Sequence, residues 1–198
     1  SGVTITNNDG KNTYTFTENG SFTFQYKDEN DFEGSAVATV SWIDKTPPEV
    51  ILESSKYKIN EDERNISNIE PDTVITAFKS NITNDRAEYK IVDKNNVEKN
   101  NENNKIATGD QIITTDGKEF TVCVTGDTNG DGQADLKDIF TINKHRLNTT
   151  LLTGVYKNAA DVNSDNKIDI KDIFKINKYR LGTITTLNNR EEKWRWKK

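Results

Sequence analysis

Residue types that serve enzyme chemistry are scarce in this chain of 198 residues. It has one cysteine, Cys123, one histidine, His145, and no methionine. A lone cysteine forms no disulfide within the chain, and a single histidine excludes a zinc site built from several His and Cys ligands. Neither residue belongs to a sequence pattern that suggests a nucleophile paired with a general base. We therefore expect no catalytic site, and we expect Cys123 to be a buried packing residue on a strand.

Long apolar runs are also missing, so no membrane-spanning segment is expected. The net charge of −5 and the pI of about 5.1, without any nucleic-acid motif, argue against binding to nucleic acid. The charge is uneven along the chain. Residues 1–126 hold twenty-two acids and thirteen bases, whereas residues 127–181 hold eight acids and nine bases. This shift predicts two or three domains.

What the chain does contain is a regular set of oxygen-bearing side chains. Residues 127–138 read DTNGDGQADLKD, with Asp or Asn at positions one, three, five, nine and twelve and glycine at position six. Calcium takes about six to eight oxygen ligands, and a loop with this spacing can wrap one ion. The expected ligands are Asp127, Asn129, Asp131, the backbone carbonyl of Gln133, Asp135 and Asp138.

The same pattern returns at residues 161–172, DVNSDNKIDIKD, with asparagine in place of the glycine. The expected ligands of this second loop are Asp161, Asn163, Asp165, the backbone carbonyl of Lys167, Asp169 and Asp172. All eight carboxylates between residues 127 and 181 occupy positions one, five, nine and twelve of the two loops, and none is glutamate. A solvated surface would scatter its acids among its bases, so we expect two Ca2+ ions as cofactors.

An amphipathic helix is predicted after each loop. Ile139, Ile142 and Arg146 recur at i, i+3 and i+7, and their counterparts do so in the second repeat. Phe140 and Phe174 beside them either pack between the helices or face a partner. Residues 118–126 alternate like a strand, so no helix enters the first loop. A paired EF-hand sensor has such a helix and a Met-rich groove, and this chain has neither pattern.

Residues 126–182 resemble a type I dockerin of the clostridial, cellulosome-like kind. The duplicated loops, the Asp at position twelve and the missing entry helix carry this resemblance. It implies an all-α fold of two calcium loop-helix (F-hand) repeats, binding to a cohesin domain of another protein, and a secreted, cell-surface-associated location. It also implies that the chain is the non-catalytic C-terminal part of a larger secreted hydrolase, either a glycoside hydrolase or a metalloprotease. Other interpretations of the loops are a calcium-stabilised structural spacer and a calcium sensor.

The resemblance places cohesin contacts at positions ten, eleven, seventeen and eighteen of each repeat. With the two phenylalanines added, the expected partner-binding residues are Leu136, Lys137, Phe140, Asn143, Lys144, Ile170, Lys171, Phe174, Asn177 and Lys178. Leu and Ile at position ten depart from the Ser/Thr pair often found in the family and favour an apolar pocket on the partner. Thirteen of twenty-one positions are identical between the repeats, which suggests docking in either of two orientations. Loaded with calcium, the module is net positive, so we expect a cohesin with an acidic face.

The N-terminal part is predicted to be mostly β. Residues 3–43 alternate with period two, with a hairpin turn at residues 18–20. The whole segment, residues 1–46, resembles part of a bacterial immunoglobulin-like surface repeat. Tyr14 and Phe16 would lie on one strand of that hairpin, and Phe22 would lie on the other.

Two further segments flank the dockerin-like repeats. Residues 49–125 predict an α+β or β-sandwich-like module, with a helix at residues 72–82 that is N-capped near Asp72. This module resembles the small domains that precede dockerins and hold them in place. Residues 183–198 form a basic and aromatic tail, which is either disordered or returns a Trp to pack near Gly126.

Overall fold

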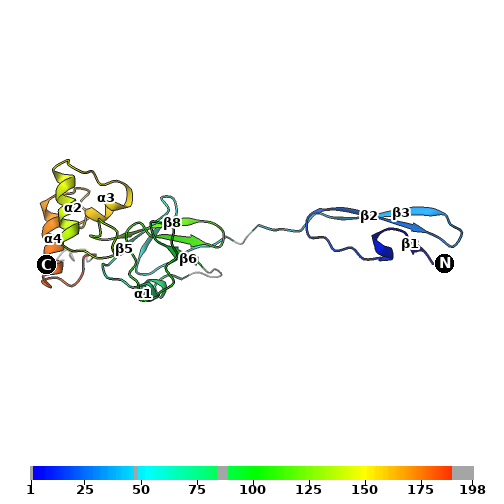
Figure 1. Ribbon diagram of the computed structural model, residues 1–198, viewed down its shortest axis with the longest axis horizontal. Helices are drawn as coiled ribbons and strands as arrows, with labels where there is room; N and C mark the ends of the chain where they lie inside the picture. Colours follow the sequence, from blue (N-terminus) through cyan, green and yellow to red (C-terminus); the bar gives the residue numbers. More distant parts are fainter. Residues whose placement is uncertain (1, 47–48, 84–88, 189–198) are drawn as a thin grey trace, which may run out of the picture. The chain divides into compact units, whose positions relative to one another are not determined.

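The computed structural model describes residues 2–46, 49–83 and 89–188, and the chain divides into two compact units, Ser1–Pro47 and Pro48–Lys198. The first unit is β-rich, and the second joins a β-sheet to a helical C-terminal region (Figure 1). Each unit is described by itself.

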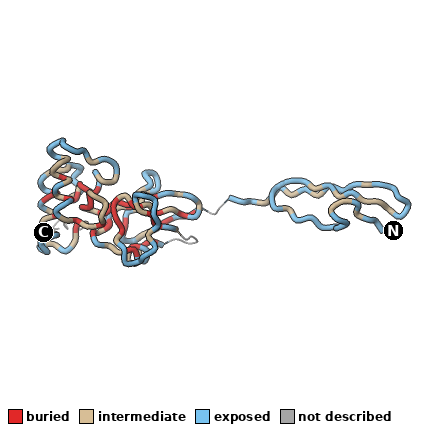
Figure 2. The backbone as a smooth tube through the Cα atoms, viewed as in Figure 1, coloured by how far each residue is buried: buried red, intermediate tan, exposed pale blue. Residues whose placement is uncertain are grey.

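The first unit is a three-stranded antiparallel sheet in the order β1-β2-β3. Its elements are β1 (Thr4–Ile5), the 3-10 turn η1 (Asn8–Gly10), β2 (Gly20–Lys27) and β3 (Glu33–Val40). None of the described residues 2–46 is buried (Figure 2), so the unit is a single layer without a core of its own.

The hairpin turn predicted at residues 18–20 is wrong. Residues 11–19 form no strand, and β1 pairs only with Tyr26 and Lys27 of β2. The segment is held through side chains instead: the ring of Tyr14 stacks on Phe22 with centroids 3.9 Å apart. The true hairpin joins β2 to β3, and Asp28 closes its turn by accepting the backbone amides of Asn30 and Phe32.

The second unit begins with a mixed five-stranded sheet in the order β4-β5-β8-β7-β6. Its elements are β4 (Lys58–Asn60), β5 (Asn65–Ile69), α1 (Ile75–Lys79), β6 (Tyr89–Val92), β7 (Gln111–Thr114) and β8 (Glu119–Val124). β5 and β8 are parallel, whereas the other neighbouring pairs are antiparallel. β8 confirms the strand predicted before the first loop. Residues 49–125 are called the sheet module below.

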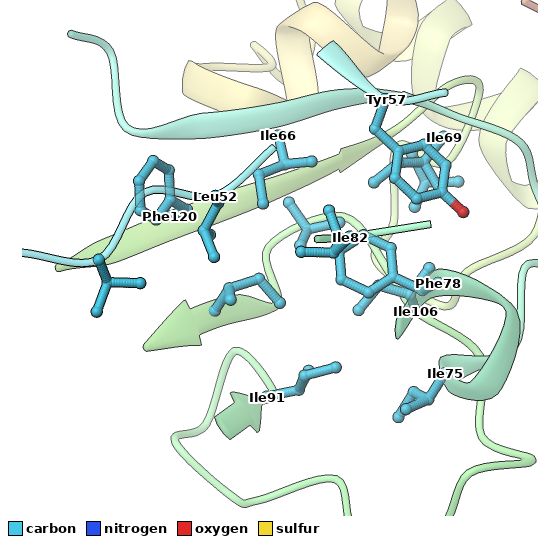
Figure 3. Packing of buried hydrophobic residues seen from close by; sticks show 14 residues of the cluster. Leu52, Tyr57, Ile66, Ile69, Ile75, Phe78, Ile82, Ile91, Ile106 and Phe120 are labelled. Carbon is cyan, nitrogen blue, oxygen red and sulfur yellow. The ribbon is translucent and has the colours of Figure 1, made fainter. Parts of the chain in front are cut away.

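The core of the sheet module lies between the sheet and α1 (Figure 3). Alternation along β5 and β8 buries Ile66 and Phe120, and α1 adds Phe78, whose ring stacks on Tyr57 at 5.2 Å. The predicted cap of α1 is wrong, because its N-cap residue is Val74 and no side chain caps it. Asp72 instead has a φ of 63° and forms an ion pair with Lys105 at 2.6 Å.

The helical region has three helices, α2 (Leu136–Arg146), α3 (Gly154–Ala160) and α4 (Ile170–Arg180). The two longer helices start where the loop pattern predicts them. A second core lies between them, formed by Ala134, Ile142, Ala160, Val162, Ile173, Ile176 and Leu187. No helix in the described part of the chain is long and apolar enough to cross a membrane.

Candidate calcium loops and docking face

Positions nine and twelve of each loop cap the helix that follows. The side chain of Asp135 accepts the amide of Lys137 at 2.7 Å, and the side chain of Asp138 accepts the amide of Asp135 at 2.8 Å. Asp169 and Asp172 repeat this capping box at 2.7 and 2.9 Å. Reciprocal bonds of this kind satisfy free amides at a helix N-terminus and fix where the helix begins.

The first loop, residues 127–138, wraps around the carboxylate of Asp127. This carboxylate accepts the amides of Gly130 at 2.7 Å, Asp131 at 3.1 Å and Gly132 at 2.9 Å. The side chain of Asn129 lies beside it and donates to Asp131 at 3.1 Å. The side chains of positions three and five thus contact each other, and the side chain of position one holds the backbone of its own loop.

The second loop, residues 161–172, has the same course but is more exposed. Asp161 accepts the amides of Asp165 at 3.0 Å and Asn166 at 2.8 Å. Asn163 donates to Asp165 at 3.2 Å. Asn166 has a φ of 64°, which is the conformation expected of the residue that replaces the glycine.

Three carboxylates of the loops are buried, namely Asp127, Asp138 and Asp172. Burial raises the pKa of Asp138 to about 6, and it raises the pKa of Asp127 and of Asp172. A buried carboxylate costs free energy unless a cation or metal balances it. The side chains at the expected ligand positions supply carboxylate and amide oxygens, which is the chemistry that calcium prefers, so the residues present fit this ion.

No group of three carboxylate, imidazole or thiol side chains is arranged as a metal cluster in the described residues. The assignment of each ligand, including the carbonyls of Gln133 and Lys167, therefore stays a prediction.

The candidate docking face is formed by Leu136 and Phe140 on α2 and by Ile170 and Phe174 on α4. These side chains are 58, 61, 42 and 58 % exposed. Phe140 and Phe174 are thus surface residues rather than packing between the helices. Lys144 lies over the ring of Phe140, with its Nζ 4.4 Å from the centroid.

The polar residues expected at this face are held by local contacts. Lys137 and Lys171 pair with the position-five acids of their own loops, at 3.2 and 3.6 Å. Asn143 accepts a guanidinium N–H of Arg146, and Asn177 accepts one of Arg180. Lys178 is exposed.

The two single residues noted in the sequence have structural roles. Cys123 is buried on β8, and burial raises the pKa of its thiol to about 12, which leaves it unreactive near neutral pH. His145 accepts the backbone amide of Leu152 through Nδ1 at 2.9 Å. It therefore orders the connection from α2 to α3.

Sequence reasoning missed the contacts that join the chain after α4 to the sheet module. Glu70 accepts the amides of Leu187 at 2.8 Å and Asn188 at 2.9 Å, so the chain after α4 returns to the end of β5. Leu187 is buried beside Gly126, which is the position considered for a returning Trp as the alternative to a disordered tail. Trp194 and Trp196 lie outside the described residues.

The family described as "Dockerin type I domain" has a model that matches residues 125–180. These residues form a type I dockerin domain. A dockerin is a non-catalytic module that binds cohesin, anchors proteins in extracellular, cellulosome-like complexes and typically binds calcium. The match does not extend into the β-rich residues before position 125. No curated protein and no solved structure matches the chain.

Proposed function

We propose that this chain docks the secreted protein that carries it onto a cohesin-bearing partner, and that it does so only when two calcium ions are bound. The observation that carries the proposal is the docking face: four large apolar side chains stand exposed at equivalent positions of two repeated helices. Exposed apolar clusters rimmed by polar residues mark protein interaction sites. By the family resemblance, the docked activity is that of a secreted hydrolase.

Calcium organises the base of this face. Each ion would offset about half of the negative charge of the four carboxylates in one loop and draw together side chains that otherwise repel one another. The ligands we assign in the first loop are Asp127, Asn129, Asp131, Gln133, Asp135 and Asp138, and those in the second are Asp161, Asn163, Asp165, Lys167, Asp169 and Asp172. Because positions nine and twelve also cap α2 and α4, holding the loop fixes the start of the helix that carries the docking residues.

The chemistry of the face indicates what the partner offers. Leu136 and Ile170 call for apolar pockets, whereas Lys137, Lys144 and Lys178 call for acidic groups around them. Both repeats present the same types of residue in the same order, so a cohesin could engage either repeat as its main contact. We therefore propose two docking orientations of similar affinity.

A capture experiment tests the function. The full chain serves as bait for clostridial culture and cell-wall extracts, once in millimolar calcium and once in chelator, and captured proteins are identified by mass spectrometry. Recovery of a cohesin-bearing protein only with calcium is the expected result. Recovery of no protein by a folded bait would favour a calcium-stabilised spacer.

Ring-deletion variants test the face and the two orientations together. Phe140→Ala or Phe174→Ala alone should weaken binding to the captured cohesin about twofold, because one orientation remains, whereas the double variant should weaken it about a hundredfold. Calorimetric titration measures these affinities. Ile51→Ala with Val97→Ala is the matched control, because both are exposed apolar residues of the sheet module. Equal losses for one single variant and the double variant would contradict the two orientations.

A further inference from the structure

The first loop is packed against the sheet module. The backbone amide of Thr108 donates to Oδ2 of Asp127 at 2.8 Å, and both residues are buried. The hydroxyl of Thr108 donates to the carbonyl of Val124 and accepts the amide of the same residue, at 3.2 and 3.0 Å. The carboxylate at position one is therefore held by a segment that lies outside the repeat.

Two other loops of the sheet module also hold this turn. The amide of Asp72 donates to the carbonyl of Gly132 at 2.8 Å. The Nζ of Lys94 donates to the carbonyl of Asn129 at 3.3 Å. Bonds from three separate segments thus meet the first loop between positions one and six.

Two glycines of the first loop are needed because of this packing. A Cβ on Gly130 would lie 2.8 Å from the carbonyl oxygen of Thr108, and one on Gly132 would lie 2.7 Å from that of Ile106. The equivalent residues of the second loop, Ser164 and Asn166, carry side chains although their φ values of 59° and 64° are also positive. Backbone conformation alone therefore does not demand glycine at these positions. The close carbonyl oxygens of Thr108 and Ile106 in the sheet module do demand it.

The second loop is not packed against the sheet module in this way. Asp161 accepts amides of its own loop, and residues 164–167 are exposed. Within the described residues, no hydrogen bond joins residues 161–172 to the sheet module.

We infer that the sheet module is a template for the first calcium site, with Thr108 as a positioning residue for Asp127. This inference rests on the proposed calcium binding. A loop that is already ordered loses less conformational entropy when an ion binds, and so binds it more tightly. The first site fills at lower calcium concentration and stays formed, whereas the ion itself must order the second loop. The second site therefore sets the calcium concentration at which the docking face is complete.

Amide hydrogen exchange of the unmodified full chain in chelator tests the template without calcium. The amides of Gly130 and Gly132 should exchange at least about tenfold more slowly, relative to their unstructured rates, than those of Asp165 and Asn166. Equal protection of the two loops would overturn the inference. This measurement decides the template even if the chain binds no calcium, an outcome that would overturn the proposed function alone.

Exchanging the position-six residues tests the effect on affinity. Gly132→Asn places in the first loop the residue that the second loop carries, and it should weaken the tighter calcium-binding step about tenfold. Asn166→Gly is the matched control and should change the weaker step less than about threefold. Two-step calorimetric titration measures both. Equal effects of the two variants, or identical affinities of the two sites in the parent protein, would overturn the inference.

The position-four residues give a second pair, Gly130→Ser and Ser164→Gly. A serine has room at this position in the second loop but meets the Thr108 carbonyl in the first. If Gly132→Asn prevents folding, as judged by circular dichroism in calcium, the template inference is tested by this second pair of variants and by the hydrogen-exchange data. Equal effects of Gly130→Ser and Ser164→Gly on their calcium-binding steps would overturn it.

Discussion

Asp116, in the turn between β7 and β8, shows how one side chain ties the start of the second unit to the sheet. Its carboxylate accepts the amide of Val50 at 2.8 Å and the hydroxyl of Thr114, and Lys118 lies 3.6 Å away. Burial opposes ionisation, but the hydrogen bonds from Thr114, Val50 and Lys118 prevail and lower the pKa of Asp116 to about 2.

This pKa predicts a pH-dependent contribution to stability. Because the folded-state pKa of about 2 lies below the ordinary value of 3.8, the carboxylate stabilises the fold above about pH 4, and this contribution disappears as the pH falls through about 2. Asp116→Asn should lower the free energy of unfolding by about 2 kcal/mol at pH 6 and by almost nothing at pH 2. Urea titrations of both proteins at several pH values measure the difference. A difference that is the same at both pH values would contradict the assignment.

At the residue scale, the sequence predicts what is local and misses what is distant. The spacing of Asp and Asn predicts two turns with the same course, and in both loops the Asp at position one accepts amides of its own loop. Thr108 and Glu70 carry no such signal, since each acts on a segment far away in the chain. The one available sign was that Gly130 and Gly132 of the first loop correspond in sequence to Ser164 and Asn166 of the second loop.

At the scale of elements, Glu70 connects the end of β5 to the chain beyond α4. Glu70→Ala leaves the amides of Leu187 and Asn188 without this acceptor and loosens Leu187 from the second core. We expect a loss of about 1–3 kcal/mol in the free energy of unfolding, from the unpaired amides and the exposed leucine. Thermal and urea unfolding of the full chain in calcium measure it.

The control for this prediction is Glu119→Ala, which removes an exposed acid from β8. Similar losses for the two variants would mean that the return of the chain to β5 contributes nothing.

Elements with a clear hydrophobic periodicity were predicted well. Elements whose position depends on which strands pair with each other were not. The isoleucines of α2 and α4 repeat at helical spacing, so both helices lie where expected. The stretch around Tyr14 alternates like a strand but forms none, and the ring of Tyr14 stacks on Phe22 of β2 instead. The parallel pairing of β5 with β8 was not foreseen, because alternation within a strand says nothing about which strand lies beside it.

At the scale of the whole molecule, the second unit holds two separate cores, one under the sheet and one between the helices. Only the second depends on the loops. In excess chelator the helical dichroism near 222 nm should fall, because four carboxylates per loop repel one another without the metal. Amides of β5 and β8 should stay protected from exchange, and α4 should lose more protection than α2. Unchanged dichroism in chelator would contradict calcium-dependent folding.

The direct passage from β8 into the dockerin has a mechanical consequence. Only Thr125 and Gly126 separate the end of β8 from the first loop. A pull on a partner held on the docking face therefore reaches the sheet at the end of β8, which is the central strand of the five. Both β5 and β7 pair with β8, so hydrogen bonds along its two edges oppose its removal from the sheet.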